Sequence, residues 1–134
     1  MVATVSADGA PQAATMGIAV TPDLDIVFDT LRSTRKYQNL LANPRVALVV
    51  SEGEVTVQYE GTAVEPEGAE LERAREAYFT VWPDGRDRLS WPGLTHMRVT
   101  PTWIRYSNFN EASREISELE FPAAGAASVT GASL

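Results

Sequence analysis

Reactive side chains are scarce in this chain of 134 residues, which contains no cysteine and a single histidine, His96. Without cysteine there are no disulfides and no thiolate metal sites, and no cluster of histidines and carboxylates shows metal-ligand spacing. No nucleophile turn accompanies His96, so hydrolysis by a serine–histidine pair is disfavoured. A lone strand histidine is usually structural, although a proton-donor role for His96 stays open. The side chains alone therefore indicate neither a metal centre nor a hydrolase.

Long apolar runs and an excess of basic residues are also missing. The chain has 18 acidic and 11 basic residues and a net charge of −7, whereas sequence-independent nucleic-acid binding needs many cationic contacts to phosphate. No apolar run reaches membrane-spanning length, and the first residues lack the basic and apolar segments of a secretion signal. We therefore expect one cytoplasmic domain without a membrane or nucleic-acid partner.

Against this acidic background, Arg32, Arg35 and Lys36 form a cationic cluster where a helix is predicted to begin. A helix start carries unpaired N–H groups and a partial positive charge, so cations there cost a few tenths to about 1 kcal/mol. A bound anion reverses this penalty, because free N–H groups, basic side chains and the hydroxyl of Ser33 or Thr34 together suit a phosphate. The alternative is a solvated helix start whose basic side chains extend into water.

Polar and apolar residues alternate through most of the chain and predict a mainly β protein. Strands are expected over residues 2–6, 12–20, 25–30, 46–50, 55–65, 96–100 and 103–107, and helices over 34–42 and 67–81. Residues 82–93 are expected to form an aromatic, turn-rich loop. The nearly unbroken apolar strand 46–50 is predicted to be buried on both faces.

Short turns between these strands favour a closed or partly split antiparallel barrel with peripheral helices. No strand leads into a glycine-rich phosphate loop, which disfavours the Rossmann and P-loop folds. We expect the barrel domain to occupy residues 1–121. The small, polar residues 122–134 are predicted to be a disordered tail.

Several motifs in fixed order resemble the pyridoxamine 5′-phosphate oxidase-like FMN-binding split-barrel family. They are Ile-Val-Phe-Asp-Thr at residues 26–30, Thr-Arg-Lys at 34–36, Leu40 and Asn-Pro-Arg-Val-Ala-Leu at 43–48. The turn at 7–12 and the run Tyr-Glu-Gly-Thr-Ala at 59–63 extend the likeness over about residues 2–108. The resemblance implies a split antiparallel Greek-key β-barrel that binds FMN.

This resemblance implies a location for each end of the cofactor. Thr34, Arg35 and Lys36 would hold the FMN phosphate, which agrees with the cationic helix start, and Thr30 would lie near the flavin or its ribityl chain. The backbone of the second strand would run along the isoalloxazine ring at Thr15, Met16, Gly17 and Ile18.

Two further positions of the implied site have simpler alternative explanations. Gly17 would allow the ring to approach closely, or it is an ordinary strand glycine. Where relatives place a glutamine that reaches the flavin, this chain has Thr56, with Gln58 one step away on the same polar face.

The family is typically homodimeric, with two cofactors at the interface that are covered by aromatic residues of the opposite subunit. Trp103, Arg105 and Tyr106 are the candidates for this covering role, and a core tryptophan, an edge-strand arginine and an interface tyrosine are the alternatives. Trp91 would close a substrate pocket or anchor its own loop. A homodimer acting on a small molecule is therefore expected.

Departures from the true oxidase leave the chemistry open. Ala14 and Ala19 stand where the oxidase has a basic pair on its second strand, and the oxidase's C-terminal region is not recognisable. We therefore expect this protein not to be a true pyridoxamine phosphate oxidase. Three possibilities remain: an FMN-dependent oxidoreductase, which is favoured; an F420-dependent reductase of the same fold; and a non-enzymatic flavin or haem carrier with His96 as a haem ligand. The substrate and electron donor are left open.

Overall fold

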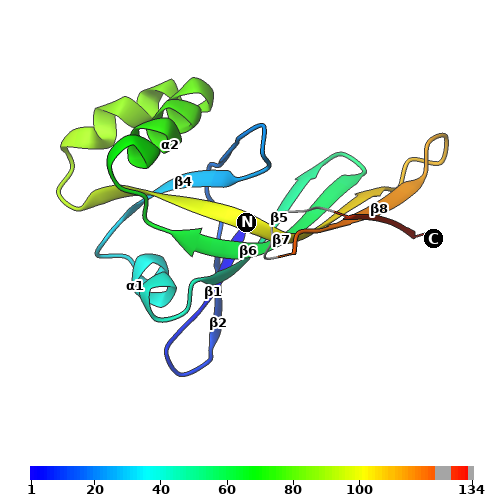
Figure 1. Ribbon diagram of the computed structural model, residues 1–134, viewed down its shortest axis with the longest axis horizontal. Coiled ribbons are helices and arrows are strands. Elements are labelled where there is room, and N and C mark those ends of the chain that lie inside the picture. The colour runs from blue at the N-terminus through cyan, green and yellow to red at the C-terminus, as the bar shows by residue number, and fades with distance from the viewer. Residues whose placement is uncertain (123–127, 133–134) are drawn as a thin grey trace.

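Antiparallel strands dominate the computed structural model, which describes residues 1–122 and 128–132 (Figure 1). The elements in chain order are β1 (Val2–Val5), β2 (Pro11–Ala14), β3 (Ala19–Val20), β4 (Ile26–Leu31), α1 (Arg35–Ala42), β5 (Arg45–Glu52), β6 (Val55–Val64), α2 (Gly68–Val81), the 3₁₀ helix η1 (Pro83–Ser90), β7 (Leu94–Asn108), β8 (Glu115–Glu120) and β9 (Ser128–Ala132). The predicted mainly β architecture with peripheral helices is confirmed.

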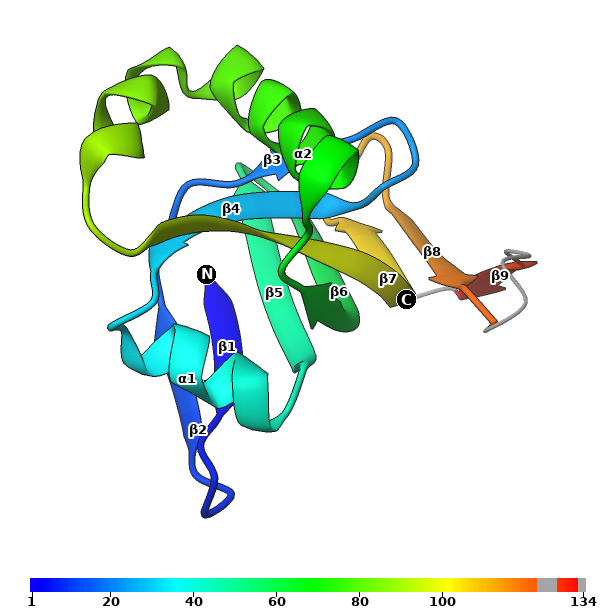
Figure 2. The ribbon, with the colours of Figure 1, turned by 60° about the vertical axis from the view of Figure 1, so that its left-hand side comes forward.

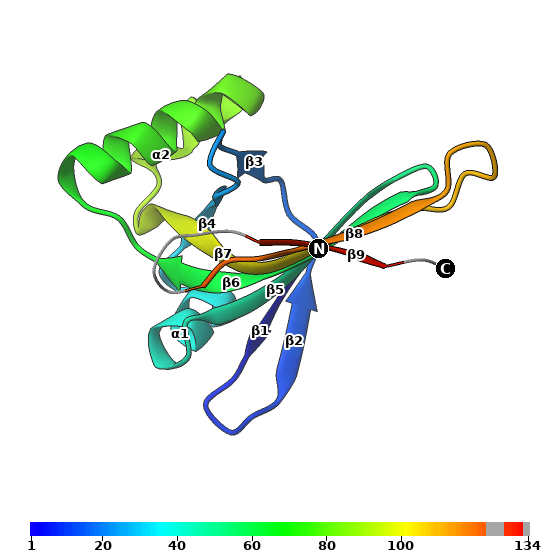
Figure 3. The same ribbon diagram turned by 45° about the vertical axis from the view of Figure 1, so that its right-hand side comes forward.

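The strands form one curved sheet in the order β2-β1-β5-β6-β7-β4-β3, and β8 pairs with both β7 and β9. All these pairs are antiparallel. Helix α1 lies beside β1 on one side of the barrel, and α2 covers β3, β4 and β7 on the other (Figure 2). Beyond the barrel, the β5–β6 and β7–β8 hairpins extend as an arm (Figure 3).

The second predicted strand is interrupted. Residues 12–20 were expected to be continuous, but β2 ends at Ala14, β3 begins at Ala19, and residues 15–18 pair with no strand. Because β2 and β3 lie at opposite ends of the sheet order, residues 15–18 carry the chain across the opening of the barrel. The barrel is therefore split at this segment.

Two apolar clusters form the core. The larger fills the barrel with inward residues from β1, β4, β5, β6 and β7 and from α1, including Phe28, Leu48 and Val99. The smaller lies beneath α2 and consists of Ala19, Val27, Ala74, Tyr78 and Phe79. Residues of β4 therefore alternate between the barrel interior and the α2 side, as expected for a strand covered on both faces.

The predicted burial of both faces of residues 46–50 is wrong for the single chain. Val46 and Leu48 are buried, whereas Val49 and Val50 are 44% and 41% exposed. These two valines lie where β5 leaves the barrel to form the arm, and the described residues leave them partly exposed there. An apolar run therefore does not by itself show that both faces of a strand are buried.

The C-terminal half differs from the prediction in four ways. Residues 96–100 and 103–107 belong to one strand, β7, which continues past Pro101 with a bulge at Thr102, opposite Glu60 and Gly61 of β6. The expected loop over residues 82–93 contains η1, and β8 was not foreseen. In the tail expected to be disordered, residues 128–132 form β9 and pair with β8, while residues 123–127 and 133–134 lie outside the described residues.

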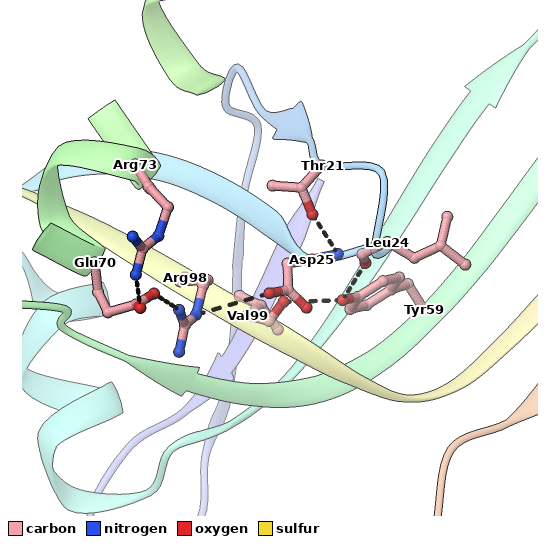
Figure 4. Close-up of polar contacts among 8 residues, drawn as sticks. All are labelled: Thr21, Leu24, Asp25, Tyr59, Glu70, Arg73, Arg98 and Val99. Carbon is pink, nitrogen blue, oxygen red and sulfur yellow. Dashed lines mark hydrogen bonds and ion pairs between the residues drawn. The ribbon is translucent and has the colours of Figure 1, made fainter. Parts of the chain in front are cut away.

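Helix α2 is braced against the sheet by a chain of charged side chains (Figure 4). Glu70 of α2 binds Arg98 of β7 at 2.7 Å and also accepts a hydrogen bond from Arg73. Arg98 in turn lies 3.8 Å from the carboxylate of Asp25. Burial raises the pKa of Asp25, and Arg98 opposes this shift. A neighbouring cavity of about 530 Å³ is lined by both Arg73 and Arg98, but carboxylates already neutralise these two arginines.

Tyr59 fixes the turn before β4 from inside the barrel. Its hydroxyl lies 2.9 Å from the carbonyl oxygen of Leu24 and 3.0 Å from that of Val99 (Figure 4). Leu24 has a φ of 67°, a left-handed conformation that is unfavourable for leucine, so the tyrosine stabilises a strained turn. Burial raises the pKa of Tyr59, which keeps the hydroxyl protonated as a donor.

Replacing Tyr59 with phenylalanine is expected to lower the free energy of unfolding by about 1–2 kcal/mol, because it removes the donor and leaves buried carbonyl groups unpaired. Urea denaturation measures this change. Tyr106→Phe is the matched control, since the Tyr106 hydroxyl has no hydrogen bond within the described residues, and it is expected to change stability much less. Equal losses for both variants would contradict the anchoring role of Tyr59.

Candidate functional site

Thr34 caps the N-terminus of α1 and uses its hydroxyl fully in doing so. The hydroxyl donates to the carbonyl of Leu31 at 2.8 Å and accepts from the backbone N–H of Tyr37 at 3.3 Å. The hydroxyl of Thr30 lies 3.0 Å from that of Thr34. Because the single Thr34 proton is directed at Leu31, Thr30 is the donor in this pair. The hydroxyl predicted to bind a phosphate is therefore a helix cap.

The next two backbone N–H groups, those of Arg35 and Lys36, have no hydrogen-bond partner among the described residues. Their side chains likewise form no ion pair there, whereas the nearby Arg32 binds Glu65 at 3.1 Å. Burial lowers the pKa of Lys36, and the carboxylate of Asp29 opposes this shift. Two free amides and two unneutralised cations thus share one helix end, an arrangement suited to an anion.

A cavity of about 390 Å³ opens at this helix end. Its lining comes from α1, β1 and β2 and consists of Val2, Thr4, Gln12, Ala13, Ala14, Thr34, Arg35 and Lys36. Asn39 of α1 ties these walls together, since its amide donates to Thr4 at 3.0 Å and to Gln12 at 2.8 Å. The helix and the first hairpin therefore hold the cavity in a defined shape.

The chain runs from this cavity into the unpaired residues 15–18, where a second cavity of about 400 Å³ opens. Met16 and Ile18 line it together with Met1, Val49, Val50 and Ser51. No backbone hydrogen bond to another backbone group is present for Thr15, Met16, Gly17 or Ile18 within the described residues. Among these residues only the Ile18 carbonyl has a hydrogen-bond partner within the described residues, and the other N–H and C=O groups are available to water or a ligand, as the predicted ring contact requires.

Trp82 lies against the same segment. Its indole N–H donates to the carbonyl of Ile18 at 2.9 Å. A Cβ at Gly17 would lie 2.9 Å from Trp82 Cε2, closer than side chains approach in proteins. The lack of a side chain at Gly17 thus makes room for the Trp82 indole. The sequence predicted either close approach of the flavin ring or an ordinary strand glycine, and neither prediction included this contact. The sequence carries no signal for this contact, because the bonded residues are 64 positions apart.

Asp29 fastens α2 and η1 to β4 next to the helix cap. Its carboxylate accepts from the Tyr78 hydroxyl at 3.1 Å and from Arg88 Nε at 2.9 Å. Burial raises the pKa of Tyr78 to about 12, so this hydroxyl stays protonated. Asp29 is therefore a structural anchor between the two sides of the site.

His96 lies fully buried under α2, with its ring centroid 5.2 Å from that of Tyr78 and 5.5 Å from that of Phe79. Neither of its ring nitrogens has a hydrogen-bond partner among the described residues. A side chain enclosed in this way reaches neither of the two cavities at residues 12–18. The structure thus places His96 in the core, enclosed by Tyr78 and Phe79.

Thr56 and Trp103 lie apart from the cationic helix end, on the outer face of the arm. Thr56 is the strand partner of Ser51, which lines the second cavity, whereas Trp103 pairs with Glu60 and lines a separate hollow near Phe121. Arg105 shares the outer face and binds Glu118 at 2.8 Å. Tyr106, the next residue on β7, belongs to the opposite face. Residues 12–18 therefore connect the two cavities, and Thr56 and Trp103 line neither of them.

The family model described as pyridoxamine 5′-phosphate oxidase matches residues 1–108. The chain belongs to this family. The pyridoxine/pyridoxamine 5′-phosphate oxidase of Rubrobacter xylanophilus is 37% identical to it over 122 residues, which cover 90% of this chain and 51% of that protein. The chain thus spans about half the length of this curated relative.

Solved structures of this family's fold extend the comparison. A pyridoxamine 5′-phosphate oxidase-related, FMN-binding protein from Nostoc punctiforme has a TM-score of 0.76 and 11% identity, covering 99% of this chain and 86% of that chain. A haem-binding protein from Mycobacterium smegmatis has a TM-score of 0.72 and 15% identity, covering 97% and 81%. At these identities the likeness shows the fold, and the predicted split barrel is confirmed. None of the helices in the described part of the chain has the length and apolar content needed to cross a bilayer.

Acidification is expected to destabilise the protein through His96. Burial lowers its pKa below the ordinary 6.5, Arg75 and Arg88 lower it further, and Asp29 opposes them. The unfolded chain therefore takes up a proton first. Stability is complete above about pH 6.5 and declines as the pH falls toward the lowered pKa of the folded state.

Urea denaturation between pH 7.5 and 5 measures this decline, and His96→Leu is expected to reduce its slope because it removes the titrating group. An unchanged slope in His96→Leu would show that other groups control the acid sensitivity.

Proposed function

We propose that the protein is an FMN-binding oxidoreductase that works as a homodimer on a small molecule. The observation that carries this proposal is the pair of free amides at the start of α1, with Arg35 and Lys36 unneutralised beside the first cavity. Membership of the pyridoxamine 5′-phosphate oxidase family supports FMN as the anionic ligand. A phosphate bound there would offset the unfavourable cationic helix start.

The residues present fit both ends of FMN. The amides and side chains of Arg35 and Lys36 would hold the phosphate, with Thr34 supporting them as the cap and Thr30 supporting Thr34. The free backbone groups of residues 15–18 would meet the edge of the ring. When bound, FMN supplies hydride or electron transfer, so the chain itself needs only to bind, orient and shield it. Because the cofactor would supply the redox chemistry, the site needs no reactive histidine or cysteine.

The name of the Rubrobacter relative suggests a vitamin phosphate as substrate, but two positions of this chain argue against it. Ala14 lines the first cavity and Ala19 is buried, so neither position offers the charge that a second phosphate requires. We therefore propose a small substrate other than pyridoxamine phosphate, reduced or oxidised at the flavin.

A second copy of the chain would cover the exposed apolar residues around the second cavity. Met1, Val49 and Val50 are 60%, 44% and 41% exposed and surround the ring end of the proposed FMN site. Burying them against a partner would remove this apolar surface from water and enclose the flavin. The outer-face positions of Thr56 and Trp103 suit contact with a partner's cofactor.

The bound cofactor decides between this proposal and its alternatives. The protein is expected to purify with a flavin absorption spectrum or to bind added FMN. Tight binding of F420 without FMN binding would favour an F420-dependent reductase. A flavin that is reduced by chemical means yet never turns over with NADPH or reduced F420 and candidate acceptors would favour a carrier. A haem carrier would need an iron ligand other than His96 in this conformation.

Replacing both Arg35 and Lys36 with alanine is expected to weaken FMN binding by about 2 kcal/mol or more, since each charged hydrogen bond contributes about 1.5 kcal/mol. Fluorescence titration of FMN measures the loss. The double variant Arg45→Ala/Arg114→Ala removes the same charge from exposed positions elsewhere and is the control. Unchanged FMN affinity in the first variant would refute the phosphate site.

The dimer is tested with Val49→Glu, which is expected to give a monomer with weakened FMN binding because a buried carboxylate opposes association. Analytical ultracentrifugation measures the mass. Val81→Glu is the control, since Val81 is 52% exposed on α2, away from the second cavity. A wild-type protein that sediments as a monomer with FMN bound would overturn the proposed dimer.

A further inference from the structure

One side-chain hydrogen bond fixes the backbone of residues 15–18, while the side chains of Met16 and Ile18 pack against the barrel core. Residues 15–18 lie between β2 and β3 without a strand partner, and the bond from the Trp82 indole to the Ile18 carbonyl, 2.9 Å long, is the one hydrogen bond that they make within the described residues. Indole N–H is a donor only, so this bond has a fixed direction. Without it, no hydrogen bond within the described residues would hold the segment between its two strands.

The indole also packs on the backbone of the segment. A Cβ at Gly17 would lie 2.9 Å from Cε2 and 3.0 Å from Cζ2 of Trp82. Gly17 is outside the left-handed region, so the glycine is required here for space and not for its backbone conformation. Neighbouring side chains of an extended segment point to opposite sides, so Trp82 covers the Gly17 side while Met16 and Ile18 line the second cavity.

Trp82 is itself firmly held. Its backbone N–H donates to the carbonyl of Tyr78 at 2.8 Å, and its carbonyl accepts from Gly85 at 2.9 Å, so the end of α2 and the start of η1 both fix it. Tyr78 is in turn bound to Asp29 of β4. The indole therefore links residues 15–18, which pair with no strand, to the end of α2 and, through Tyr78, to β4.

We propose that Trp82 is a positioning residue for the flavin ring, which it serves by holding residues 15–18 so that their free backbone groups meet the ring. The inference rests on the proposed FMN function and assigns the control of the ring end to a residue outside the family motifs named above. Trp82 would affect binding of the flavin ring by positioning residues 15–18, whereas Arg35 and Lys36 would bind the phosphate directly. Substitutions at the two ends are therefore expected to have separate effects on FMN binding.

Trp82→Phe tests this separation, because phenylalanine keeps a ring but loses the N–H. The Kd for FMN is expected to rise about three- to tenfold, the usual effect of one hydrogen bond, and the Kd for riboflavin, which lacks the phosphate, is expected to rise by the same factor. The absorption maxima and reduction potential of the bound flavin are expected to shift. Arg35→Ala/Lys36→Ala is expected to weaken FMN binding and leave riboflavin binding unchanged.

Trp91→Phe is the matched control, since Trp91 follows η1 with a side chain that is largely exposed. Hydrogen exchange of the ligand-free protein gives an independent measurement: in Trp82→Phe the amides of residues 16–18 are expected to exchange faster, while those of α1 are unchanged. Gly17→Ala is expected to weaken flavin binding in the wild type and to have little effect in a Trp82→Ala background, where the space is free.

The outcomes separate the two proposals. If Trp82→Phe binds FMN and riboflavin with wild-type Kd and spectrum, or differs no more than Trp91→Phe does, the positioning role is refuted and the FMN function stands. If the wild-type protein binds no flavin, both proposals fall.

Discussion

The arrangement of the site depends on the hydrogen bonds that the carboxylate of Asp29 accepts from Tyr78 and Arg88. This carboxylate joins the Tyr78 hydroxyl and the Arg88 guanidinium to the middle of β4, and thereby fastens α2 and η1 to the barrel. The helix end held in this way carries Trp82 to residues 15–18. The next residue of β4, Thr30, supports the cap of α1 from the other face of the strand. One strand thus serves both ends of the proposed ligand.

The site leaves backbone groups unpaired in two places, and both follow from the fold. A helix always begins with free amides, and here Thr34 caps the amide of Tyr37 and leaves those of Arg35 and Lys36 free. A split barrel has a segment that belongs to no sheet edge, and residues 15–18 are that segment. A ligand can bind at these positions without breaking any strand pairing. The unpaired backbone N–H and C=O groups are thus preorganised for binding, and the barrel can remain rigid.

Much of the fold could be predicted because strand alternation, turn residues and the cap at Thr34 are local patterns. The cationic helix start could also be predicted, since Thr30, Thr34, Arg35 and Lys36 lie within seven positions. The break at residues 15–18 could not, because their apolar content resembles that of a paired strand. Likewise, the run at 46–50 indicated burial, but sequence alone does not say whether the chain or a partner covers Val49 and Val50.

The sequence by itself thus determined the strand-rich secondary structure and the cationic helix start, because both follow from patterns among residues close in the chain. Only the tertiary structure decided what individual side chains do. It enclosed His96 between Tyr78 and Phe79 and set Trp82 against Gly17. The physical reason is that these contacts join residues far apart in the chain, which meet only when the barrel and its helices pack together.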